Sequence, residues 1–77
     1  MDPYETQVET AHRHVIEAEA QLALQMVVIA DLASEDYDTC IAEALLVTFT
    51  HTLRFMREAL VLAQKEQQVA QGRHPNR

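Results

Sequence analysis

The chain has 77 residues, of which 48% are hydrophobic, and twelve acidic against six basic side chains give it a net charge of −6. A chain this short forms one domain at most, and a single core of that size is only marginally stable without reinforcement. The excess of acid opposes a phosphate backbone, so we expect no nucleic-acid partner. The one cysteine, Cys40, excludes an intrachain disulfide.

The composition is typical of an all-α protein. Ala, Leu, Val, Glu and Gln dominate, whereas the chain has one Gly, two Pro and no Trp. No uncharged apolar run approaches the roughly 18 residues that a membrane span requires. The acidic start also lacks the basic and apolar regions of a secretory signal. We therefore expect a cytoplasmic protein without a membrane partner.

The first predicted element is a long amphipathic helix over residues 3–34. Apolar residues recur in it at alternating spacings of three and four, with one polar interruption at Gln25. Pro3 suits a first helical turn, and Asp2 suits the N-cap before it. The repeat consists of Val8, Ala11, Val15, Ala18, Leu22, Gln25, Ile29 and Leu32.

A turn is predicted over residues 35–38, where turn-forming and capping residues replace the apolar repeat. Asp36 is the best candidate for a left-handed backbone position, which Asp tolerates better than most residues with a side chain. Asp38 or Thr39 should cap the helix that follows.

The second predicted helix covers residues 39–71 and completes a hairpin domain over residues 1–71. Gly72 and Pro75 then predict a flexible tail over residues 72–77. Its apolar repeat consists of Ala42, Leu46, Phe49, Leu53, Met56, Leu60 and Ala63.

A short turn between two long helices forces them to pack antiparallel, side by side. The charge distribution agrees with this pairing. Residues 1–38 hold nine acids and one base, whereas residues 39–77 hold three acids and five bases. Each exposed ion pair contributes only about 0 to 1 kcal/mol, so these charges orient the helices and do not drive their association.

Both helices carry more apolar residues than one hairpin seam can use, as in the run Val27-Val28-Ile29. We therefore expect two copies to form a homodimeric four-helix bundle. A monomer with scattered surface hydrophobes and a complex with another protein's helix are the alternatives. The expected interface consists of Val15, Leu22, Ile29, Leu46, Phe49, Leu53, Met56 and Leu60.

Few residues carry possible chemistry. His14, Glu17 and His51 are candidate metal ligands, although the two histidines do not meet within one hairpin and would combine only across a dimer. Cys40 begins the second helix, where the helix dipole favours a thiolate, but packing is the simpler interpretation. The other glutamates are interpreted as a solvated face. We expect no catalytic residue and no cofactor.

Two motifs resemble a family of small, functionally unassigned bacterial helical-hairpin proteins. The first, His-Val-x-Glu-x-Glu, spans residues 14–19. The second, Asp-Thr-x-x-Ala-Glu-x-Leu-Leu-x-x-Phe, spans residues 38–49, and a Thr-Leu pair follows at residues 52–53. The resemblance implies a helical hairpin and no particular activity. The chain departs from the family at Asp36-Tyr37, where Gly-His is frequent, and at Arg54-Phe55-Met56-Arg57, where His-rich sequence is frequent.

Taken together, these patterns predict a non-enzymatic, self-associating protein that serves as an interaction or regulatory module, with a further protein partner left open. The alternative is a small metal- or ligand-binding four-helix bundle that uses inward-facing histidines.

Overall fold

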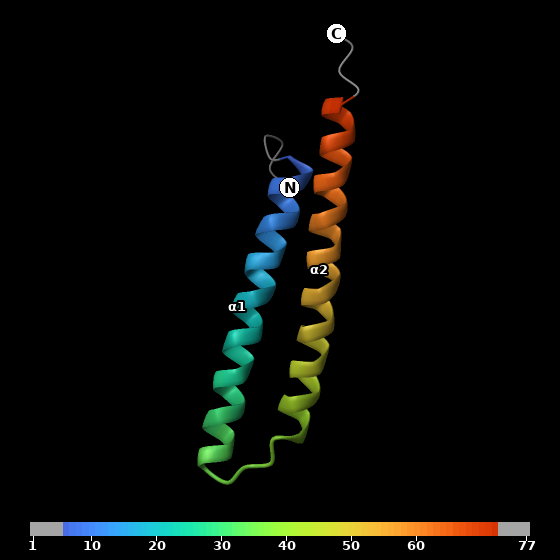
Figure 1. Cartoon of the computed structure of the whole chain (residues 1–77). Helices are drawn as coiled ribbons and strands as arrows, with labels where there is room; N and C mark the ends of the chain where they lie inside the picture. Colours follow the sequence, from blue (N-terminus) through green and yellow to red (C-terminus); the bar gives the residue numbers. More distant parts are fainter. Residues whose placement is uncertain (1–5, 73–77) are drawn as a thin grey trace.

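The computed structural model describes residues 6–72. These form two helices, α1 (Gln7–Ser34) and α2 (Cys40–Gly72), which lie side by side and antiparallel and are joined by a short turn (Figure 1). The predicted all-α hairpin is therefore confirmed. The molecule is only 14 Å deep in its thinnest direction. Because this is about one helix diameter, neither helix has a second layer behind it.

α1 begins at Gln7, so the predicted start at residue 3 is wrong. The cause is a capping box that supplies partners for the first free N–H groups of the helix. The Thr6 hydroxyl accepts a hydrogen bond from the Glu9 N–H at 3.1 Å, and the Glu9 carboxylate accepts one from the Thr6 N–H at 2.9 Å. Asp2 and Pro3, the predicted cap and first residue, lie outside the described residues.

α1 ends where Asp36 takes the left-handed conformation, with φ of 61°, as predicted. Two hydrogen bonds close the turn: Tyr37 N–H donates to the Leu32 carbonyl at 2.9 Å, and Asp36 N–H donates to the Ala33 carbonyl at 3.1 Å. This is the Schellman arrangement, which satisfies carbonyl groups that the helix end would leave free. The chain thereby reverses direction without a glycine.

Asp38 caps the start of α2. Its carboxylate accepts a hydrogen bond from the Cys40 N–H at 2.9 Å, while the Thr39 carbonyl accepts the first helical bond from Glu43 at 2.8 Å. The predicted cap is confirmed, and α2 is displaced by one residue from the predicted range 39–71. Gly72 is the last residue of α2, so the predicted tail begins one residue too early, and its remainder, residues 73–77, lies outside the described residues.

The hydrogen bond from Cys40 lowers the pKa of Asp38 below its ordinary value. A depressed carboxyl pKa stabilises the folded state above the unfolded pKa of about 3.9, and this stabilisation disappears as the pH falls through the lower folded value. We expect Asp38→Asn, which cannot ionise, to be less stable than wild type at pH 6. The difference should shrink towards zero as the pH falls below about 3.9.

The measurement is thermal unfolding of both proteins from pH 7 to pH 2 at the same protein concentration, because association would make the Tm depend on concentration. Other carboxylates titrate in both proteins, so only the difference in Tm is compared. A difference that stays constant over this range would contradict the role of the ionised Asp38 carboxylate.

The two helices meet along one seam. Every residue of the two predicted apolar repeats, from Val8 to Leu32 and from Ala42 to Ala63, is buried or half-buried. Val15, Ala18 and Leu53 form the centre of the seam. Leu22, Met56 and Leu60 pack against this centre. Beyond Ala63 the side chains of α2 are exposed, because α2 extends past the start of α1.

Leu53 is the most shielded apolar side chain, with 4% of its surface exposed. We expect Leu53→Ala to lower the free energy of unfolding by about 2 to 3 kcal/mol, because it removes buried methyl groups from a seam that has few. The control is Leu62→Ala, at a position that is 58% exposed, and it should change stability by no more than about 0.5 kcal/mol. Chemical denaturation at matched concentration measures both, and equal effects would contradict the assigned core.

One polar side chain crosses the seam. The Gln25 amide nitrogen on α1 donates a hydrogen bond of 2.7 Å to the carbonyl oxygen of Ala42 in the first turn of α2. Gln25 is half-buried and Ala42 is buried. A polar group at a seam position fixes register, because sliding either helix would leave it without a partner. The polar interruption in the repeat therefore sets which residues face one another.

Candidate interaction surface

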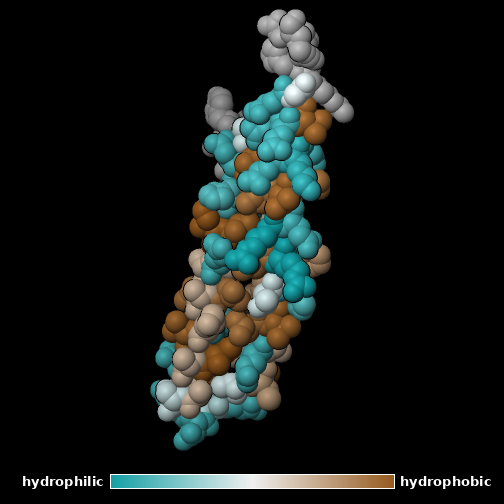
Figure 2. All heavy atoms as spheres, viewed as in Figure 1, coloured by the Kyte–Doolittle hydropathy of each residue, from teal (hydrophilic) through white to brown (hydrophobic). Residues whose placement is uncertain are grey.

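Large apolar side chains point away from the seam over much of both helices. Figure 2 shows them in brown among polar residues on the visible face. Several are strongly exposed, such as Leu24 at 66% and Phe55 at 67%. The exposed set within residues 6–72 is Ile16, Leu24, Met26, Val27, Val28, Tyr37, Ile41, Leu45, Val47, Phe55, Val61, Leu62 and Val69.

The shielded set is much smaller. Among the described residues only Val15, Ala18, Ala42 and Leu53 are buried apolar side chains, and none of them is completely removed from solvent. A hairpin in isolation thus leaves most of its large apolar side chains partly in water, where each forgoes part of the roughly 1.5 to 3 kcal/mol that complete burial contributes. Apolar surface of this extent is typical of a contact site.

The structure places all eight residues of the expected interface in the seam of one hairpin. Val15 and Leu53 are buried there, so their main contacts are within the chain. The six others are half-buried and retain exposed surface, namely Leu22, Ile29, Leu46, Phe49, Met56 and Leu60.

One face of the hairpin carries charged residues. Arg57 on α2 reaches across to Glu19 on α1, with 3.1 Å between guanidinium nitrogen and carboxylate oxygen. Residues seven apart share a helix face, so Met26 lies with Glu19, and Thr50 and Glu43 lie with Arg57. We call this the charged face.

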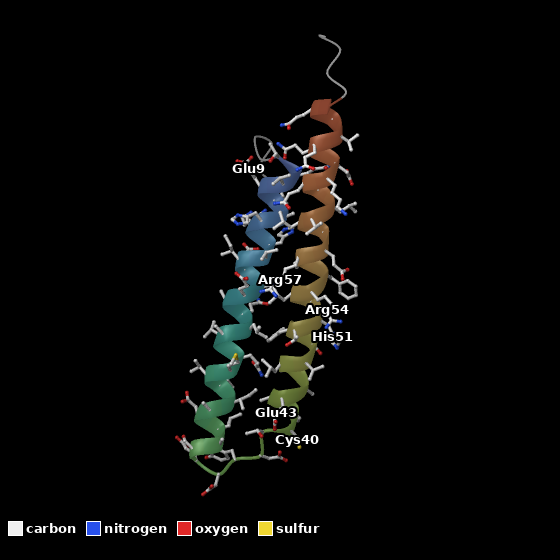
Figure 3. All side chains as sticks on the ribbon, viewed as in Figure 1. Glu9, Cys40, Glu43, His51, Arg54 and Arg57 are labelled. Carbon is white, nitrogen blue, oxygen red and sulfur yellow. The ribbon has the colours of Figure 1, made fainter. Side chains whose placement is uncertain are left out.

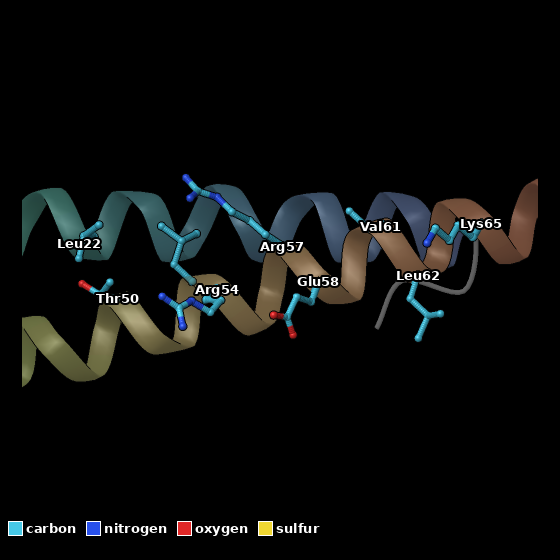
Figure 4. A pocket seen from close by; sticks show the side chains of 9 residues that line it. Leu22, Thr50, Arg54, Arg57, Glu58, Val61, Leu62 and Lys65 are labelled. Carbon is cyan, nitrogen blue, oxygen red and sulfur yellow. The ribbon is translucent and has the colours of Figure 1, made fainter.

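The charged face contains a shallow groove of about 740 Å³ (Figure 4). Leu22 from α1 and Leu53 and Val61 from α2 supply apolar lining, while Arg54 and Lys65 line it with cations. Arg54, Arg57 and Lys65 are thus gathered on one side of α2, and Arg57 pairs with Glu19 of its own chain.

The opposite face carries fewer charges. His14 on α1 lies beside Ala59 and Ala63 on α2, where these residues line a smaller depression. Residues seven apart lie in one row along a helix face. On α1 the row of His14 continues with Gln21 and Val28, and on α2 the row of Ala59 also contains Leu45 and Thr52. We call these six positions the uncharged face, because none of them is Asp, Glu, Lys or Arg. Glu66 continues the row of Ala59 towards the open end and lines the same depression as His14.

The candidate metal ligands do not converge. His14 is half-buried beside Ala59, whereas His51 is exposed on the side of α2 away from α1 (Figure 3). Glu17 pairs with Arg13 at 3.3 Å. No group of three or more His, Cys, Asp or Glu within residues 6–72 is arranged to hold a metal ion.

The remaining candidates are also solvent-facing. Cys40 is an exposed free thiol at the start of α2. Glu19 and Glu43 are exposed, and the Glu43 carboxylate accepts a hydrogen bond from the Thr39 hydroxyl. Within the described part of the chain, these groups surround no cleft that could isolate a substrate from water.

The turn end of the hairpin is strongly acidic. The charge count of residues 1–38 and 39–77 does not show this cluster, because the boundary between the two ranges falls within it. Five exposed carboxylates gather there, and the chain has no Lys or Arg between Arg13 and Arg54. We call this cluster the acidic end. It consists of Asp31, Glu35, Asp36, Asp38 and Glu43.

No protein-family model, curated protein or solved structure matches the chain. Neither helix, over the residues described, has a stretch long and apolar enough to cross a membrane.

Proposed function

We propose that this chain is a non-enzymatic, self-associating protein whose hairpins pair into a four-helix bundle that serves as an interaction module. The observation that supports the proposal is the imbalance between shielded and exposed apolar surface. Four buried apolar residues stand against thirteen large exposed ones within residues 6–72. A two-helix layer cannot correct this imbalance alone, whereas a second layer can.

The seam itself supports association. Residues such as Ile29, Phe49 and Met56 lie at core positions of the repeat but are only half-buried. In a four-helix bundle such positions point towards the central axis and are covered from the other layer. A second hairpin would thus complete the core that the first one starts, without any change in its backbone.

Side chains on the outer surface support a role in interaction. Leu24 and Val27 on α1, and Phe55 on α2, lie away from the seam and would stay accessible after two layers pair. They provide apolar contact area for another protein. The proposal of a binding module therefore rests on surface that pairing does not use.

We expect light scattering to give twice the 8.8 kDa chain mass at micromolar concentration and above. The midpoint of thermal unfolding should rise with protein concentration, because association and folding are coupled. Both quantities are measured over a hundredfold dilution series.

A mass of 8.8 kDa at every concentration, together with a concentration-independent unfolding midpoint, would overturn self-association. The exposed apolar residues would then belong to a site for a different chain, and the protein would serve as bait in a search for that chain.

A further inference from the structure

The distribution of charge points to one arrangement of the dimer, and this inference rests on the self-association proposed above. We infer that a second copy packs against the uncharged face, with the two turns at opposite ends of the bundle. The occupant of this face is therefore another hairpin of the same sequence, rotated by a twofold axis perpendicular to the helices.

The acidic end selects the orientation. With both turns at the same end, ten carboxylates from the two copies of Asp31, Glu35, Asp36, Asp38 and Glu43 would gather there. No Lys or Arg lies close by in the sequence, and charges gathered at one end repel one another over a Debye length of about 8 to 10 Å. With the turns at opposite ends, each acidic end lies beside the open end of the other hairpin.

The rest of the hairpin accepts this neighbour more readily because it is nearly neutral. Outside the acidic end, the described residues contain five acids and four bases: Glu9, Glu17, Glu19, Glu58 and Glu66 against Arg13, Arg54, Arg57 and Lys65. Each exposed pair contributes little, but the difference between the two orientations adds over many charges.

The twofold axis also selects the face. An axis perpendicular to the helices stacks α1 on its own copy and α2 on its own copy, so residues near mid-length meet themselves. On the charged face, Arg54 and Arg57 would approach their own copies, and like charges in an interface are strongly unfavourable. On the uncharged face, the mid-length residues are Gln21 on α1 and Thr52 on α2, which are neutral.

The middles of the two helices lie near the same level, which allows extensive overlap. The middle of α1 (Gln7–Ser34) falls at Ala20 and Gln21, and the middle of α2 (Cys40–Gly72) falls at Met56. The ion pair between Glu19 and Arg57, and the groove that Leu22 and Leu53 both line, place the middle of α1 beside residues 52–57 of α2. A twofold axis at this level superposes the two hairpins over most of their length and brings Val28 and Leu45 under cover.

Cys40 provides a native reporter of orientation, because it is the only cysteine and is exposed near the turn. A nitroxide attached to this thiol allows the distance between the two copies to be measured by pulsed electron resonance. Cys40 lies twelve residues from Thr52 and sixteen from Met56, which bracket the mid-level of α2. At 1.5 Å per residue on each side of the axis, we expect a distance of about 35 to 50 Å. Turns at the same end would give less than about 25 Å, since neighbouring helices lie 8–10 Å apart.

A matched sample gives the complementary result. In Cys40→Ser/Gln68→Cys the label moves to the open end of α2. Mixing this variant with labelled wild type should give a short distance, below about 25 Å, between labels on different chains. A short distance in wild type with a dimeric mass would overturn the orientation and leave self-association intact. A monomeric mass with no dipolar signal would overturn the proposed function and, with it, this inference.

The face has its own test. Gln21→Glu adds a charge to the middle of the uncharged face with little change in shape, at an exposed position. The control Gln64→Glu adds the same charge to the row of Arg57, on the charged face. We expect Gln21→Glu to raise the dimer Kd roughly tenfold or more, because the two new carboxylates meet near the axis. Gln64→Glu should change the Kd less than about twofold, and the reverse ranking would overturn the choice of face.

Discussion

Two helices that lie side by side can shield each other along only one stripe apiece, and this limit governs the whole molecule. The stripe here centres on Val15, Ala18 and Leu53, and it lies between helices of 28 and 33 residues. The backbone hydrogen bonds form within each helix and need no tertiary contact. The apolar side chains, in contrast, are buried only where another helix covers them. The result is a molecule with regular secondary structure and too little interior.

Several features could be predicted from the sequence because they depend on local patterns. Every member of the three-and-four repeat from Val8 to Ala63 is buried or half-buried, although the repeat did not include the buried Thr10. The sequence around Asp36 and Asp38 located both the left-handed residue and the cap. The start of α1 was missed, although the spacing of Thr6 and Glu9 is a capping-box signature, because Asp2 and Pro3 offered a competing start. Where two local patterns predict different helix starts, the sequence alone does not show which one the folded chain uses.

Other features depend on register and could not be predicted from the pattern alone. Gln25 is visible in the sequence as a break in the repeat. Its hydrogen bond to Ala42 could be predicted only if the register of the two helices were known. The division into a charged and an uncharged face also depends on register. The ion pair between Arg57 and Glu19 on the other helix places Arg57 on the charged face. The seam residues expected to form an intersubunit interface proved to face the other helix of the same chain first.

The thinness of the hairpin has a consequence for the cell. When the second layer of a core comes from another molecule, the fraction of folded chains depends on how many chains are present. At low copy number most chains would be unfolded and would be degraded by proteases. Above a threshold concentration they would accumulate as stable assemblies. A protein built in this way would convert a gradual change in its own synthesis into a steeper change in the amount of functional surface.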